Sequence, residues 1–316
     1  MKDNTKLLLL FMSSLLFITL FIGIGLTVDN YEYFLSRRIP KVLAIILAGI
    51  AIAQSSLAFQ TITNNRILTP SIMGFDSLYL LIQVVIVAMF GRFSMLILSD
   101  YINFFLSVFI MMVFSLLLFS FYFRGKKLNL IALLLLGVIL GQVFANISSF
   151  FMMLMDPNDF AAVQASMFAS FNNINVSLTY LCLPLLVLIC ICLYRLHAKL
   201  DVFWLDHDNA ISLGVDVRTV TMYVLLLSAS LIAISTALIG PVMFFGLLVT
   251  NLTRELFNTY QHRVLLIASS LFAITALLSG QWIIENIFNF STTLSIVINF
   301  IGGLYFLSIL LRNKVV

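Results

Sequence analysis

The stretch SRRIPKVLAIILAGIAIAQSSLAFQ, residues 36–60, places three cations around a proline and then continues as a long apolar run. From residue 42 to residue 60 the run has no charged side chain and no strand-like alternation of polar and apolar positions. Roughly 20 such residues cross the hydrocarbon core of a bilayer as a helix. Because unpaired backbone groups are costly in lipid, an isolated run of this kind must be helical. The stretch therefore predicts a membrane-spanning helix that starts beside Pro40 and leaves Ile39 non-helical.

The rest of the chain repeats this pattern. Of its 316 residues 62% are hydrophobic and 9% are charged, and the mean hydropathy is +1.13. A soluble core is excluded, and we expect an all-α polytopic membrane protein with about ten spanning helices in one domain, residues 1–316. The pair of segments that meets at Gly240-Pro241 is also compatible with one broken helix, because proline disrupts a helix. The apolar segments cover residues 7–28, 42–60, 71–90, 102–122, 128–155, 177–197, 219–239, 240–257, 263–283 and 291–311.

The distribution of charge orients these segments. If the N-terminus is inside and ten segments span, the outer loops carry only Arg37, Arg38, Lys41 and Arg92, and the other lysines and arginines fall inside. This asymmetry follows the positive-inside rule. We therefore expect a multi-pass protein of the cytoplasmic membrane with both termini in the cytoplasm. The net charge of +4 then reflects cytoplasmic loops, and no nucleic-acid partner is predicted.

The longest polar interruption lies on the predicted inner side. It reads RLHAKLDVFWLDHDNAISLGVDVRT, residues 195–219, with basic ends, an acidic middle and an apolar set around Gly214. The pattern predicts two short helices broken at that glycine. Two interpretations stay open, because the segment is either an amphipathic connector on the bilayer surface or a projection that fits another protein.

Chemistry-bearing motifs are absent from the sequence. It contains no HExxH, GxSxG, CxxC or glycine-rich phosphate loop, and His197, His207 and His262 lack the spacing of metal ligands. A catalytic role and a bound cofactor are therefore not expected. An ion-coupled carrier needs an ionisable group inside the membrane, for which Asp76 and Glu285 are the nearest candidates. A transport path without such a group needs energy from elsewhere, for which a separate ATPase subunit would suffice. An ion-coupled carrier remains the alternative to this interpretation.

Several motifs, taken in chain order, resemble the FecCD-type permeases of ABC importers for iron-siderophores, haem and vitamin B12. The likeness covers nearly the whole chain. The family's start of the second helix is similar to Arg38-Ile39-Pro40-Lys41, and its aspartate-proline loop is similar to Asp156-Pro157. The other matching stretches are A-x-x-L-G-V at Ala210, Leu213, Gly214 and Val215, GPVMFFGLLVTNLTRELF from Gly240, His262 to Leu266, and Gly302-Gly303.

The chain also departs from the family pattern. Lys41 replaces an arginine, Thr250-Asn251 replaces a proline-histidine pair, and the loop before the last segment lacks an arginine that often completes the outer docking site. The form SIMGFDSLYLLIQ, residues 71–83, resembles a branch that carries catecholate-type siderophores and pairs with a different sister permease. The resemblance thus implies a heterodimer of permeases.

The resemblance also implies a fold, partners and site residues. They are a type II ABC importer permease fold, an ABC ATPase dimer, an extracytoplasmic siderophore-binding protein and a ferric siderophore as cargo. Arg37, Arg38 and Lys41 would meet carboxylates of the binding protein, although on charge alone they could equally reach lipid phosphates. In the loop at about 198–219, coupling to the ATPase would fall to Asp208, Ala210, Leu213, Gly214 and Val215. The candidate path residues, which could equally serve interhelical hydrogen bonds, are Gln54, Gln60, Gln83, Gln142, Asn146 and Asn251.

Overall fold

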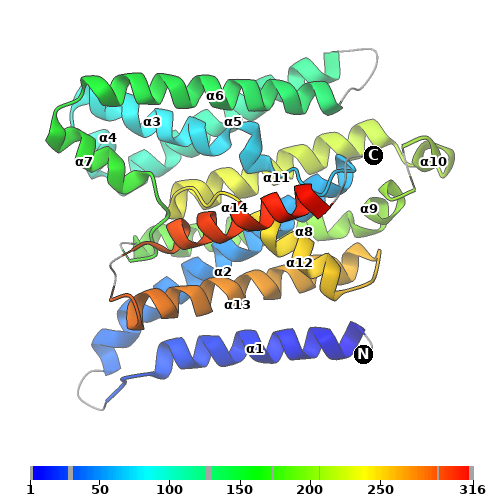
Figure 1. Cartoon of the computed structure of the whole chain (residues 1–316), viewed down its shortest axis with the longest axis horizontal. Coiled ribbons are helices and arrows are strands. Elements are labelled where there is room, and N and C mark those ends of the chain that lie inside the picture. Colours follow the sequence, from blue (N-terminus) through cyan, green and yellow to red (C-terminus); the bar gives the residue numbers. More distant parts are fainter. Residues whose placement is uncertain are drawn as a thin grey trace.

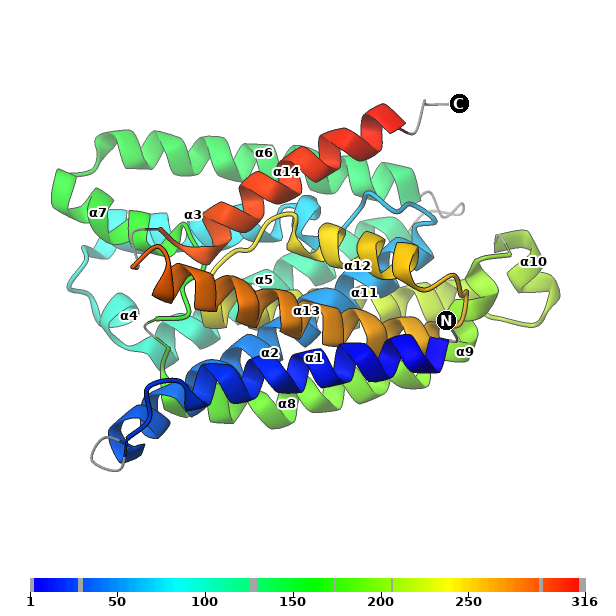
Figure 2. The same ribbon diagram turned by 60° about the horizontal axis from the view of Figure 1, so that its bottom comes forward.

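The computed structural model describes residues 3–27, 31–124, 130–172, 174–205, 207–289 and 292–312, and within these ranges it contains helices and no strands. The helices lie side by side, with α6 on one side of the bundle and α1 on the opposite side (Figures 1 and 2). In chain order they are α1 (Asp3–Gly23), α2 (Tyr31–Ile62), the 3₁₀ turn η1 (Pro70–Met73), α3 (Phe75–Phe90), α4 (Met95–Leu98), α5 (Asp100–Arg124), α6 (Leu130–Leu154), α7 (Pro157–Ser166), α8 (Val176–Arg195), α9 (His197–Phe203), α10 (His207–Ser212), α11 (Val217–Ile239), α12 (Phe245–Leu256), α13 (His262–Asn286) and α14 (Leu294–Arg312).

Each of the ten predicted apolar segments corresponds to one of these helices. Within the described ranges seven helices are long and apolar enough to cross a membrane, namely α1, α2, α5, α6, α8, α11 and α13. The apolar helices α3 and α14 are shorter, and α12 has only 12 residues. The expected all-α membrane fold is confirmed, and about ten is an approximate count of its spanning elements.

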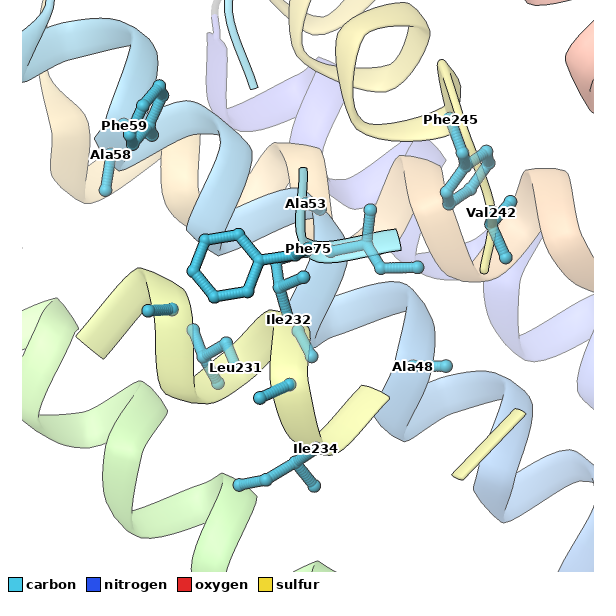
Figure 3. Packing of buried hydrophobic residues seen from close by; sticks show 14 of the residues in the cluster. Ala48, Ala53, Ala58, Phe59, Phe75, Leu231, Ile232, Ile234, Val242 and Phe245 are labelled. Atoms are coloured by element: carbon cyan, nitrogen blue, oxygen red, sulfur yellow. The ribbon is translucent and has the colours of Figure 1, made fainter. Parts of the chain in front are cut away.

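Helix α2 forms the centre of the bundle. In its apolar window 83% of the residues are buried, against 11% in α1. Alanines at 44, 48, 51 and 53 are fully buried, and small residues of this kind let neighbouring helices approach closely. Helices α11 and α13 pack on α2. Figure 3 shows part of this core, where Phe75, Ala53 and Ile232 belong to one cluster of buried residues.

The break at Gly240-Pro241 separates two helices rather than kinking one. Helix α11 ends at Ile239, and α12 begins only at Phe245, after a non-helical connection. The carbonyl of Ile239, which a continuous helix would use internally, accepts a hydrogen bond of 2.9 Å from the backbone N–H of Ser170. The prediction of two segments here agrees with the structure.

Two backbones meet where η1 passes α6. Gly74 has φ +91°, and a Cβ built on it would lie 2.7 Å from the Cα of Gly141. Real Cβ atoms do not approach another backbone this closely, and a left-handed φ disfavours any L side chain. Glycine at both positions is therefore what allows α3 and α6 to pack against each other.

The two ends of the bundle carry different elements. Helix α1 begins, and α14 ends, at the end that also carries α9 and α10 (Figures 1 and 2). The end of α1 and the start of α2 lie at the opposite end, together with α7. We call these the α10 end and the α7 end.

Candidate functional site

The cations of residues 37–41 lie at the α7 end, within α2 rather than at its start. The helix begins at Tyr31, so Pro40 is inside it and the expectation that Ile39 leaves the helix is wrong. Side-chain contacts in the first turns of α2 explain why the helix begins before Pro40. Arg37 lies 4.8 Å from the ring centroid of Tyr33, and Arg38 lies 4.7 Å from that of Phe34. These are pairs at positions i and i+4, which stabilise a helical turn.

The three cations have different surroundings. Arg37 is exposed. Arg38 is half-buried, and its guanidinium donates hydrogen bonds to the carbonyls of Ile22, at 2.9 Å, and Ile24. Ile22 is in the last turn of α1 and Ile24 follows the helix, at the end where a helix leaves carbonyl acceptors without internal partners. Arg38 therefore links α2 to the end of α1.

Lys41 joins three parts of the chain. Its ammonium forms an ion pair with Glu285 of α13 and donates a hydrogen bond of 2.8 Å to Oδ1 of Asn172. Gln281, one turn before Glu285, donates to the same two acceptors, at 2.7 Å to Glu285 and 3.1 Å to Asn172. We call Lys41, Asn172, Gln281 and Glu285 the α7-end clasp. Sequence reasoning could not predict this cluster, because its members come from three distant segments of the chain.

The α10 end is built from α9, α10 and the residues around Gly214. The first short helix ends at Phe203 and the second begins at His207, so Gly214, with φ +82°, follows the second helix instead of separating the two. Ala210 is fully buried, whereas Leu213 is 62% exposed. The N–H of Val215 closes the turn on the carbonyl of Ala210 at 3.1 Å. Asp208 belongs to α10, but its side chain lies outside the described part of the chain.

A buried histidine, His262, connects this end to the bundle through contacts that its sequence context does not predict. Both the backbone N–H and Nδ1 of His262 contact Oδ1 of Asp201 in α9, at 2.6 and 2.7 Å. Nε2 lies 2.8 Å from Oγ1 of Thr61 in α2. Burial opposes ionisation of Asp201, but the hydrogen bonds from the side chain and backbone of His262 lower the pKa of that carboxyl below its usual value. Helix α9 is thereby tied to α2 and α13.

The predicted path residues do not form one lining. Within the described residues Gln54 donates to Ser270 at 3.2 Å, and Gln83 donates to Asn103 and Ser107. Asn251 donates to the carbonyls of Arg66 and Leu247, each at 2.9 Å. Gln60 is buried with neither amide atom hydrogen-bonded. Only Gln142 and Asn146 are exposed, one turn apart on α6.

The candidates for ion coupling are also separated. Asp76 is buried in the first turn of α3, where the hydroxyl of Thr236 lies 3.5 Å from its carboxylate. Glu285 is paired with Lys41 at the α7 end. Among the described residues there is no group of three or more His, Cys, Asp or Glu side chains that could hold a metal ion.

Residues 6–312 match the FecCD transport family. The chain belongs to this family. It is 47% identical over 314 residues to the petrobactin import system permease protein YclO of Bacillus subtilis, covering 99% of both chains. It is 34% identical over 278 residues to the petrobactin import system permease protein FatC of Bacillus anthracis, covering 88% of this chain and 78% of that protein.

A solved structure has the same fold. It is described as an inward-facing conformation of a metal-chelate type ABC transporter, and the superposition has a TM-score of 0.85 at 22% identity. The match covers 99% of this chain and 100% of that one. A FecCD chain is a transport permease subunit and not an enzyme, so the ABC-importer interpretation is favoured over the ion-coupled carrier.

Proposed function

We propose that this chain is one of two permease subunits of an importer that moves a ferric siderophore of the petrobactin type across the cytoplasmic membrane. The observation that carries the proposal is the 47% identity to YclO over nearly the full length of both chains. A separate ABC ATPase dimer supplies the energy, and both termini lie in the cytoplasm. The α10 end then faces the cytoplasm and the α7 end faces outward, in accord with the distribution of cations along the sequence.

At the outer end we propose that the siderophore-binding protein docks on Arg37, Arg38 and Lys41. Arg37 is exposed and held over Tyr33, so a carboxylate can reach it directly. Lys41 is paired with Glu285, and docking there requires a carboxylate of the binding protein to take the place of Glu285. Arg38 supports the surface by fixing the end of α1. Such charge complementarity sets orientation and encounter rate.

At the inner end we propose that the coupling segment, residues 207–215, inserts into a groove of the ATPase. Leu213 and Ile211 are exposed apolar side chains, whereas Ala210 is buried and anchors the segment to the bundle. The contact between Asp201 and His262 then transmits movement of α9 to α13. In this proposal the helices tilt as a rigid body, and rigid-body movement is a common form of conformational switching.

We propose that the cargo passes along the exposed face of α6 that carries Gln142 and Asn146. Polar side chains are costly where they face lipid, so this face is better suited to a water-filled path or a second subunit. The second permease is expected to be a different chain, as the sequence of residues 71–83 suggests. Gln54, Gln83 and Asn251 then serve as hydrogen-bonding groups within the subunit.

The test is uptake of iron-labelled petrobactin by cells in which the gene for this chain is deleted and then restored. Restored cells should take up ferric petrobactin but gain no uptake of a ferric hydroxamate, and vanadate should block the uptake. Accumulation of ferric petrobactin by the purified chain alone, in sealed vesicles with an ion gradient, would contradict the proposal.

A further inference from the structure

A cavity of about 280 Å³ lies at the α10 end, apart from the coupling segment and from the exposed face of α6. It opens between the turn after α2, the residue after α9 and the connection from α12 to α13. Two arginines reach it from different elements, Arg66 from the turn and Arg254 from α12. The lining residues are Arg66, Trp204, Arg254, Phe257, Asn258, Thr259 and Tyr260.

The two arginines share one aromatic ring. The guanidinium of Arg66 lies 5.4 Å from the ring centroid of Trp204, and that of Arg254 lies 5.0 Å from it. Cation–π contacts of this kind hold a guanidinium in place without neutralising it. The backbone of Arg66 is fixed as well, because Asn251 donates to its carbonyl at 2.9 Å.

Within the described residues the charge of this cavity is not balanced. No carboxylate forms an ion pair with Arg66 or Arg254, and Arg254 has only one long hydrogen bond, 3.4 Å to Thr61. Nε of Arg254 and Nε1 of Trp204 are buried donors without an acceptor. A buried donor that lacks an acceptor is costly, and two adjacent cations repel each other. An anion in the cavity would relieve both costs.

We propose that this cavity is a binding site for a phosphate group. Guanidinium groups match the oxygens of a phosphate in geometry, and the lining adds donors on Asn258, Thr259 and Tyr260. The observations favour the head group of an anionic lipid as the source of that phosphate. Basic pockets between membrane helices bind such head groups, and Trp204 and Tyr260 are residue types enriched at the membrane surface.

The test uses the full chain in nanodiscs of phosphatidylcholine, with or without phosphatidylglycerol. Trp282→Phe leaves Trp204 as the only tryptophan, so its fluorescence reports on the cavity. Phosphatidylglycerol is titrated in one arm and inorganic phosphate in the other, and native mass spectrometry counts the lipids retained after extraction. Arg66→Gln and Arg254→Gln are compared with Arg263→Gln, an exposed arginine of the same end that does not line the cavity.

We expect the titrations to change Trp204 fluorescence, and each cavity variant to bind about five- to tenfold more weakly. Arg263→Gln should bind as the unchanged chain does. Arg66 is exposed, so its variant keeps the test valid even if Arg254→Gln fails to fold. Retention of phosphatidylglycerol identifies a lipid, and a response to inorganic phosphate alone identifies a free ion; both support the site.

Two results would overturn the proposal. One is equal binding by Arg66→Gln and the unchanged chain in both arms. The other is a loss of ATPase binding in Arg66→Gln without any change in lipid or phosphate binding, because the cavity would then receive a carboxylate of the ATPase.

Discussion

Replacing Glu285 by glutamine tests whether Lys41 takes part in docking. The side chains of Lys41 and Glu285 are 16% and 21% exposed, so their ion pair is neither at the surface nor fully buried. Exposed pairs contribute about 0–1 kcal/mol, and breaking a buried pair costs about 3–5 kcal/mol, so about 1–2 kcal/mol is expected here. In Glu285→Gln the folded chain loses part of this stabilisation, and Lys41 is left without its carboxylate.

Although Glu285→Gln should destabilise the folded chain, it should increase the affinity for the binding protein. If the binding protein docks as proposed, its carboxylate has to displace Glu285 before it reaches Lys41 in the unchanged chain. Removing this competitor should strengthen docking by about 1 kcal/mol, which is about fivefold in affinity. The gain should shrink at high salt, because the contact is partly exposed to solvent.

The assay is the affinity of the binding protein for the importer reconstituted in nanodiscs, measured at low and at high salt. Glu255→Gln is the control, since Glu255 is an exposed acid at the other end of the bundle. Lys41→Gln should weaken docking. If Glu285→Gln docks no more tightly than the control, and Lys41→Gln docks normally, Lys41 serves only to hold α2 to α13 and the reasoning fails.

Three further predictions concern backbone and pH. Gly214→Val should uncouple ATP hydrolysis from uptake while Gly214→Asn should not, because φ is +82° with open space around it; equal coupling in both would refute this. Gly74→Ala should lower stability by about 2–4 kcal/mol in thermal unfolding, and Gly91→Ala, which has a similar φ but no close backbone, by about 1–2 kcal/mol; equal losses would exclude the close contact as the cause. Asp201→Asn should be less stable than the unchanged chain at neutral pH. Because the pKa of Asp201 is lowered in the folded chain, its contribution is present above the usual aspartate pKa and is lost only as the pH falls through the lowered value. A difference that disappears between pH 5 and 7 would contradict this assignment.

Much of the fold follows from hydropathy alone. Lipid leaves helices as the only option for long apolar runs, so the order and number of segments could be predicted. The start of α2 could not, since residues 31–41 are aromatic and cationic and carry a proline. What extends the helix there is side-chain pairing of Tyr33 with Arg37 and of Phe34 with Arg38, which hydropathy does not register.

The candidate site was less accessible to prediction. Residue type singled out the cations, and the resemblance to the family singled out the candidate coupling segment, but the partners of these residues are set by three-dimensional packing. Lys41 forms an ion pair with Glu285 because α2 and α13 pack together. The guanidinium groups of Arg66 and Arg254 both lie over the ring of Trp204, which comes from a third element. The positions of Gln54 and Gln142 illustrate the same limit, since one is buried and the other exposed although both are glutamines in apolar helices.

The contact between Gly74 and Gly141 limits how this transporter could be re-engineered. Since a Cβ at position 74 would lie 2.7 Å from the Cα of Gly141, the backbones of η1 and α6 are in close contact, and a movement of α6 that keeps this contact carries the start of α3 with it. Enlarging either glycine cannot be offset by trimming the other, which has no side chain to give up. If the cargo follows the path proposed above, attempts to alter cargo preference should therefore substitute residues on the exposed face of α6, at Gln142 and Asn146, and leave Gly74 and Gly141 unchanged.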